Sequence, residues 1–194
     1  LTNDINFISM GAVELEVINN AILTIDANIT FPTVNINSQS QIILNSGTIN
    51  GSIFKGLGNL TINNATLYAN QINVSTTQTS GELRTASNLS LPLGFNQTGG
   101  DIYLTISSNS SNQSLILQGD IQLNGKLNIS TDQSYSPIPG TQFQIIQLNN
   151  NSISGSPTFN MQELIKAYDW NKVPLLQKGS TRVIFSGHPS IGLE

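Results

Sequence analysis

The chain has 194 residues, which is enough for one domain with a buried core, and 9% of them are charged, against about a quarter in an average globular protein. The net charge of −4 comes from 11 acidic and 7 basic residues scattered along the sequence, which excludes the basic surface that binds nucleic acid or an anionic membrane. Cysteine is absent, so disulfides and thiolate metal sites are excluded, and no apolar run approaches the length of a membrane span. Neutral polar residues, among them 25 Asn, 23 Ser and 17 Thr, must therefore keep the surface soluble.

Residues 1–12 are predicted to form an N-terminal strand. Leu1, Ile5 and Phe7 alternate with polar residues, and Asp4 is the one charge in this stretch. Such a strand either caps the first turn of its own domain or adds to the sheet of a neighbouring subunit. The second arrangement predicts head-to-tail self-association, which does not close and therefore builds a filament. The start at Leu1, without Met, fits a mature secreted chain or a segment of a longer one.

Residues 13–194 are predicted to form a single β-rich domain. Its clearest strand signal is residues 23–31, where odd positions are apolar and even positions polar, so Leu23, Ile25, Ile29 and Phe31 are expected in the core. Turns rich in Asn, Gly and Ser separate further segments with the same alternation. These segments are residues 13–17, 34–36, 42–44, 60–62, 72–74, 89–93, 102–106, 115–117, 121–123, 127–129, 143–145 and 183–185.

Many of these strands have only three residues, which favours an irregular parallel β-helix, whose short strands stack coil upon coil. A small residue also recurs two positions before an aliphatic one, although its spacing is not regular. A β-sandwich with a strand donated between subunits is the alternative. The steps with a small residue before an aliphatic one start at Ala21, Gly47, Ala65, Gly81, Gly119 and Gly125.

One short helix is predicted near residues 160–168. Residues 161–168 contain good helix formers without β alternation, and Asn160 can cap their N-terminus. Pro157 and Pro174 flank this segment, which limits the helix to one or two turns.

The C-terminal third carries a series of motifs. Its order is L-N-G-K-L-N-I at 123–129, Y-S-P-I-P-G-T-Q-F-Q-I-I at 135–146, I-S-G-S-P-T-F at 153–159, Y-D-W at 168–170 and T-R-V-I-F at 181–185. Over roughly residues 119–187 this order resembles the closing coils of secreted β-helix adhesins of the autotransporter-passenger and filamentous-haemagglutinin-like families, with Pro157 as a departure. The resemblance implies a right-handed parallel β-helix, a C-terminal capping region from about residue 119, and cell-surface adhesion or filament formation.

A weaker resemblance is to archaeal thread-type surface filaments. Their subunits are β-rich, heavily N-glycosylated and joined head to tail by donated strands, and the high Asn, Ser and Thr content, low charge and missing cysteine agree with them. No local motif carries this second resemblance.

Eleven N-x-S/T sequons predict that the chain is a glycoprotein, because composition alone would produce about half as many. The same pattern also arises where Asn and Ser or Thr flank an aliphatic residue on the polar side of a strand. The candidate glycosylation sites are Asn28, Asn50, Asn59, Asn64, Asn73, Asn88, Asn96, Asn109, Asn112, Asn128 and Asn150.

No residue set predicts catalysis, a cofactor or a metal site. His188 is the one histidine, in a Gly/Pro turn, and it leaves a triad at most one candidate base. Glu14, Glu16 and Asp26 are the nearest approach to a carboxylate pair or a Ca²⁺ site, and a solvated strand face explains them more simply.

The sequence therefore predicts a secreted or cell-surface glycoprotein that is not an enzyme. We expect it to act as a filament subunit or adhesin segment that self-associates head to tail through strands, with surface carbohydrate or a cell-surface ligand as a further partner. The alternative is a carbohydrate-binding or polysaccharide-cleaving β-helix.

Overall fold

The structure is a computed structural model, and it describes residues 14–107, 113–132, 142–148, 153–160 and 182–186. The described residues form strands and turns that belong to a single 18-stranded sheet. The strands are β1 (Glu14–Val17), β2 (Ile22–Asp26), β3 (Ile29–Ile36), β4 (Gln41–Ser46), β5 (Thr48–Ile62), β6 (Thr66–Tyr68), β7 (Gln71–Gln78), β8 (Glu82–Arg84), β9 (Leu89–Leu91), β10 (Phe95–Gln97), β11 (Asp101–Ile106), β12 (Leu115–Leu117), β13 (Ile121–Leu123), β14 (Lys126–Thr131), β15 (Gln142–Leu148), β16 (Ile153–Ser154), β17 (Thr158–Asn160) and β18 (Arg182–Ser186).

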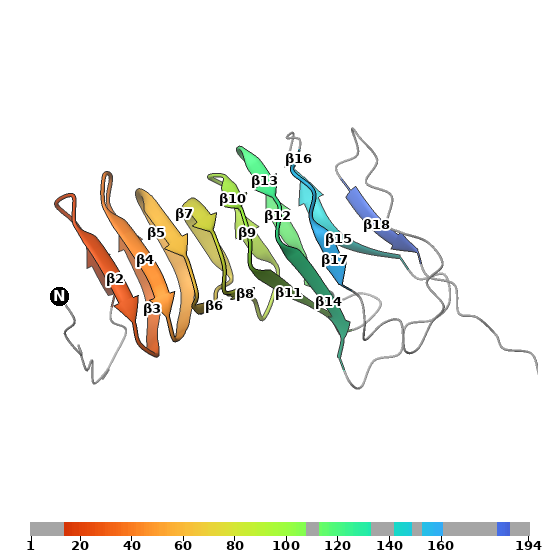
Figure 1. The fold of residues 1–194 in the computed structure, drawn as a ribbon, viewed down its shortest axis with the longest axis horizontal. Helices are drawn as coiled ribbons and strands as arrows, with labels where there is room; N and C mark the ends of the chain where they lie inside the picture. Colours follow the sequence, from red (N-terminus) through yellow and green to blue (C-terminus); the bar gives the residue numbers. More distant parts are fainter. Residues whose placement is uncertain (1–13, 108–112, 133–141, 149–152, 161–181, 187–194) are drawn as a thin grey trace, which may run out of the picture.

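The strands stack into a parallel β-solenoid with three faces, and successive coils follow one another along its long axis (Figure 1). Face A contains β2, β4, the end of β5, the end of β7, β10, β13 and β16. Face B contains the start of β3, the start of β5, β6, β8, β11, β14 and β17. Face C contains β1, the end of β3, the middle of β5, the start of β7, β9, β12 and β15.

Parallel pairing confirms the predicted β-helix and shows that the sandwich alternative is wrong, because a sandwich is built from antiparallel neighbours. The exception is β18, which pairs antiparallel with β15. The irregularity is confirmed as well. Stacked positions on face A are 18, 16, 19, 26 and 32 residues apart in the series Ile42, Leu60, Thr76, Phe95, Ile121 and Ile153.

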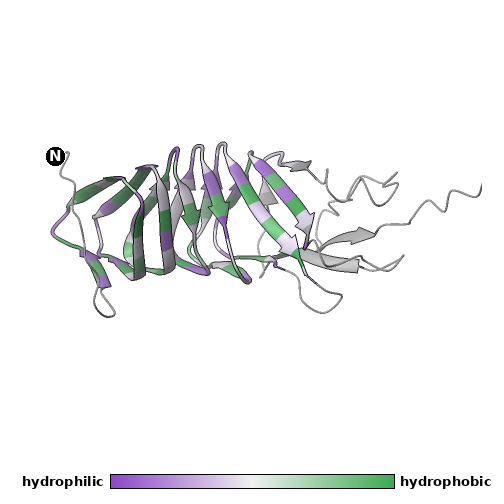
Figure 2. Ribbon diagram, turned by 90° about the horizontal axis from the view of Figure 1, so that it is seen from below, coloured by the Kyte–Doolittle hydropathy of each residue, from purple (hydrophilic) through white to green (hydrophobic). Residues whose placement is uncertain are grey.

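The core is a set of stacked aliphatic side chains. Figure 2 shows hydrophobic and hydrophilic positions that alternate along many of the strands, as the period-two alternation requires. Ile25 and Phe31 are buried, and Leu23 and Ile29 pack against the core, as predicted. The polar positions between them are exposed.

Residues 23–31 do not form one strand, however, which corrects the sequence interpretation. β2 ends at Asp26 and β3 begins at Ile29, so the chain turns a corner of the solenoid between faces A and B. The corner consists of two residues, 27 and 28. Because the alternation has a period of two, odd-numbered positions face the core on both sides of this corner.

Several predictions lie outside the described residues. These are the N-terminal strand with Leu1, Ile5 and Phe7, residues 161–168 of the predicted helix, and the single histidine, His188. Asn160, the expected cap of that helix, is the last residue of the strand β17. In the part of the chain that is described, no helix is long and apolar enough to cross a membrane.

Candidate functional site

The first coil presents an apolar end. Within the described residues, the outer edges of β1, β2 and the start of β3 have no strand partner, since each pairs only with the following coil. A hollow of about 410 Å³ opens there, lined by Leu15, Val17, Leu23, Ile25 and Phe31 among others. Unpaired backbone groups beside an apolar hollow are the features to which an added β-strand binds.

Two large apolar side chains near this end are exposed. Ile22 is 66% exposed and Ile18 is 42% exposed, and both line the same hollow. Leu57 is more exposed, at 80%, but it lies at a corner of β5 away from the hollow, between the glycines Gly56 and Gly58. The apolar end is thus a continuous surface rather than a single exposed side chain.

The sequons are distributed over all three faces. Asn28, Asn50, Asn59, Asn64, Asn88 and Asn96 are exposed, while Asn73 and Asn128 are partly buried. Asn109, Asn112 and Asn150 lie outside the described residues.

Some of these asparagines have structural contacts. The side-chain oxygen of Asn28 accepts a hydrogen bond from the Thr48 backbone N–H at 2.7 Å, and that of Asn88 accepts one from Ser114 at 3.2 Å. The Oδ1 atom of Asn73 is buried with no hydrogen-bond partner among the described residues. An amide group in that position is poorly placed to carry a glycan.

The carboxylates that the sequence suggested as a pair have separate partners. Glu14 lies 2.9 Å from Lys55 in an exposed ion pair, and Glu16 accepts hydrogen bonds from Asn35 at 3.3 Å and Asn37 at 3.4 Å. No group of three His, Cys, Asp or Glu residues that could hold a metal ion occurs in the described ranges.

Asp26 belongs to a polar ladder instead. Its Oδ1 accepts hydrogen bonds from Asn45 at 2.8 Å and Ser46 at 3.2 Å, Asn63 donates to Asn45 at 3.5 Å, and Thr79 donates to Asn63 at 2.8 Å. This ladder joins four successive coils along the edge of face A. Amides, hydroxyls and one carboxylate thus connect neighbouring coils on this surface through hydrogen bonds without an ion pair among them.

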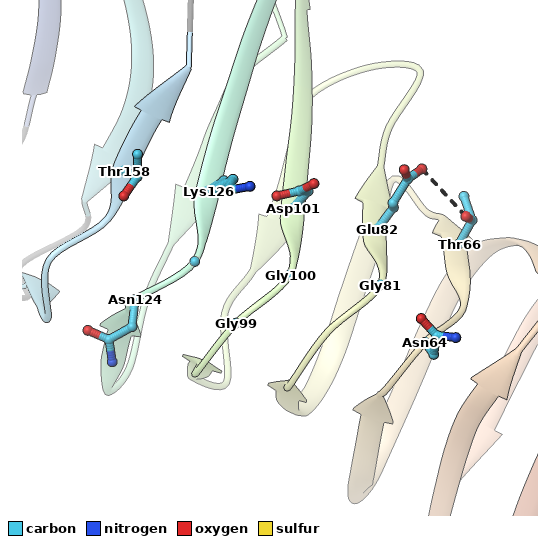
Figure 3. A pocket seen from close by; sticks show the side chains of 11 residues that line it. Asn64, Thr66, Gly81, Glu82, Gly99, Gly100, Asp101, Asn124, Lys126 and Thr158 are labelled. Carbon is cyan, nitrogen blue, oxygen red and sulfur yellow. Dashed lines mark hydrogen bonds between the residues drawn. The ribbon is translucent and has the colours of Figure 1, made fainter.

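A lateral groove of about 610 Å³ runs along the corner between faces A and B. Its wall is a row of polar side chains at stacked positions of β6, β8, β11, β14 and β17 (Figure 3). Asn64 and Asn124 lie on the turns that precede the row. In order, the row is Thr66, Glu82, Asp101, Lys126 and Thr158.

Glycines make the floor of this groove. Gly81, Gly100 and Gly125 each precede a member of the row. A Cβ added at Gly100, whose φ is +82°, would lie 2.8 Å from the Gly81 carbonyl oxygen, and one added at Gly125 would lie 2.4 Å from the Gly100 oxygen. Any larger residue would push the coils apart, so the glycines allow both the close stacking and the hollow.

Buried glutamines hold this floor from inside. Gln78 and Gln97 occupy interior positions, and the Gln78 amide donates to the Asp101 backbone oxygen at 3.2 Å. The Gln97 amide donates to Gln78 and to the Gly100 oxygen, both at 3.3 Å, and its own oxygen accepts from the Gly125 N–H at 3.2 Å. The network provides hydrogen-bond partners for polar backbone groups at the corner and ties the groove floor to the interior.

The charged groups that line the groove, together with Arg84 beside it, balance one another. Arg84 donates from Nε to Glu82 at 2.8 Å and stacks on the ring of Tyr103, 3.9 Å from its centroid. Asp101 and Lys126 form no ion pair with any described residue.

The pKa shifts here favour a fixed charge pattern. Burial lowers the pKa of the Arg84 guanidinium, but the hydrogen bond and charge of Glu82 raise it, and the balance lies above the ordinary value. Burial, followed by the carboxylates of Glu82 and Asp101, raises the pKa of the Tyr103 hydroxyl against the opposing charge of Arg84. Arg84 is therefore charged and Tyr103 neutral at physiological pH.

The sequence interpretation missed this groove, although a signal for it was present. Five of the small residues that precede an aliphatic one are stacked on one another in successive coils at the A–B corner. They are Gly47, Ala65, Gly81, Gly100 and Gly125. Ala21 and Gly119 instead precede strands of face A. Because the sequence analysis treated both groups as one series, the spacing of small residues looked irregular and the repeat at the A–B corner was not recognised.

No protein-family model, curated protein or solved structure matches this chain.

Proposed function

We propose that this chain is an extracellular structural or adhesive glycoprotein of a cell surface, a filament subunit or adhesin segment that assembles through β-strand contacts. The observation that carries the proposal is the apolar end of the first coil, where strand edges that have no partner among the described residues surround an apolar hollow of about 410 Å³. A strand from a neighbouring copy fits both features, because its backbone completes the ladder and its alternating side chains fill the hollow.

Residues 1–12 are the proposed donor. Leu1, Ile5 and Phe7 have the alternation that this role requires, and the contact is heterologous, so repeated addition gives a filament. The low charge and the polar ladder from Asp26 to Thr79 support an extracellular setting, and so does the number of exposed sequons.

Deletion of residues 1–8 is the direct test. We expect the truncated chain to remain folded, with the circular dichroism of a β-protein, and to sediment as a monomer where the full chain forms head-to-tail assemblies under negative-stain microscopy. The proposal fails if the truncated chain still polymerises or if the full chain is monomeric at all concentrations.

A matched pair of substitutions tests the receiving end. Ile22→Lys places a charge on the apolar end and should abolish assembly, because the charge must be desolvated when a strand docks. Leu57→Lys places the same charge on a more exposed leucine away from that end and should leave assembly unchanged. Equal effects of both substitutions would show that assembly uses another surface.

A further inference from the structure

We propose that the lateral groove between faces A and B binds a neutral oligosaccharide, which lies along the solenoid axis. This proposal goes beyond assembly and does not depend on it, since the groove lies on the side of the solenoid and is built by coils that follow the first one.

The shape of the groove selects a linear, repeating ligand. Its wall has one side chain per coil from Thr66 to Thr158, and adjacent strands of a sheet lie about 4.8 Å apart. Four such steps give a groove about 19 Å long. A chain of sugar units presents similar groups at each step along such a wall, whereas a compact metabolite fills only part of it.

The balance of charge selects a neutral ligand. Glu82 is paired with Arg84, and the groove carries one further carboxylate, Asp101, beside one ammonium group, Lys126. A site for phosphate, nucleic acid or a metal ion would carry an excess of one sign. Side-by-side donors and acceptors suit hydroxyl groups, each of which donates one hydrogen bond and accepts others.

A row of flat side chains runs parallel to the polar row. Tyr68, Arg84 and Tyr103 are stacked in register, each two residues after a member of the wall and on the same side of its strand. Tyr68 is 41% exposed. Aromatic rings and a stacked guanidinium present apolar surfaces, against which the C–H face of a sugar ring packs while its hydroxyls reach the polar row.

Hydrogen bonds from inside the solenoid preorganise the groove. Gln78 and Gln97 tie the groove floor to the interior, so a ligand does not have to order the site when it binds. A preorganised site loses less free energy to ordering and can hold even a ligand that makes mostly hydrogen bonds.

The test is calorimetric titration of the full chain, produced without glycans in bacteria, with hexasaccharides of β-1,4-glucose, β-1,4-N-acetylglucosamine and β-1,3-glucose. We expect at least one to bind with 1:1 stoichiometry and with little dependence on salt up to about 0.5 M, because the ligand has no charge to screen. Hexagalacturonate is the anionic comparison. The proposal is overturned if no neutral hexasaccharide binds or if hexagalacturonate binds more tightly with a steep dependence on salt.

Substitutions locate the site. Asp101→Asn, Lys126→Met and Tyr68→Ala should each weaken binding about tenfold, while the fold measured by circular dichroism is unchanged. Glu14→Gln and Lys55→Met are the matched controls, because they remove an exposed acid and an exposed lysine from face C. An equal loss in the control variants would overturn the assignment to the groove.

The source of the oligosaccharide is tested with protein from a glycosylating host. Asn64 lies in a sequon at the end of the groove. If native protein binds the hexasaccharide as well as the bacterial protein does, the ligand is a separate glycan. If native protein binds only after Asn64→Gln, the groove of native protein is occupied by the glycan attached to Asn64. The groove then still binds an oligosaccharide, but one that belongs to the same chain.

Discussion

At the scale of single residues, alternate positions of one strand have opposite environments. Ile42 in β4 is fully buried in the core, whereas the next residue, Ile43, is partly exposed on face A between Thr24 and Thr61. The two isoleucines are chemically identical, so any difference between their mutational effects comes from their environment alone.

We expect Ile42→Asp to lower the free energy of unfolding by roughly 3 kcal/mol or more, because an unpaired charge or a protonated acid must then occupy an apolar interior. Ile43→Asp should lower it by less than about 1 kcal/mol, mainly through weaker strand propensity. Urea denaturation followed by circular dichroism measures both values. Similar losses at the two positions would contradict the strand register described above.

At the scale of elements, β7 and β10 are unusual because the core-facing positions near their ends are polar. Ile62 stacks on Gln78, Gln78 on Gln97, and Gln97 on Leu123, so two glutamines interrupt an aliphatic ladder. A buried amide is stabilising only when its hydrogen bonds are made, and here both side chains bond to the corner backbone.

Gln97→Leu should lower the free energy of unfolding by about 1–3 kcal/mol, because the buried Gly125 N–H loses its acceptor. The double variant Gln78→Leu/Gln97→Leu should cost less than the sum of the single variants, since their mutual hydrogen bond is counted in each. Gln122→Leu, at an exposed position of β13, is the control and should change stability by less than about 0.5 kcal/mol. Additive effects of the two buried substitutions would show that the glutamines act independently.

At the scale of the whole molecule, stability comes from the contact of each coil with its neighbours. The outward-facing side chains on the sides of the solenoid are therefore available for binding and for modification. Sequons appear on every face, one face corner carries the lateral groove, and the first coil carries the apolar end. Glycans on exposed asparagines would keep the sides of neighbouring molecules apart while leaving end-to-end contact open.

Because six sequon asparagines are exposed, we expect native protein to have a mass several glycan units above the 20.8 kDa of the bare chain. Occupancy should be high at exposed sites such as Asn50 and Asn96 and low at Asn73, whose amide oxygen is buried. Intact-mass and glycopeptide mass spectrometry measure both. A native mass equal to that of the bare chain would show that the sequons reflect strand alternation alone.

The sequence by itself determined the all-β class and the inward and outward sides of most strands, and it favoured an irregular parallel solenoid; the parallel pairing of the strands then excluded the sandwich. These follow from local causes: period-two alternation fixes which side chains are buried, and Asn and Gly turns fix where strands end. The residue-by-residue prediction held even across residues 23–31, where the chain turns a corner that the alternation does not reveal.

Only the tertiary structure decided which coils lie side by side and, with them, the two candidate surfaces. Glu82, Asp101 and Lys126 are 19 and 25 residues apart in sequence, and they form a row because the coils between them differ in length but return to the same corner. Coil length depends on how each loop closes, which residue alternation does not encode. The apolar end has the same origin, since an edge becomes visible only when it is known which strand has no neighbour on one side.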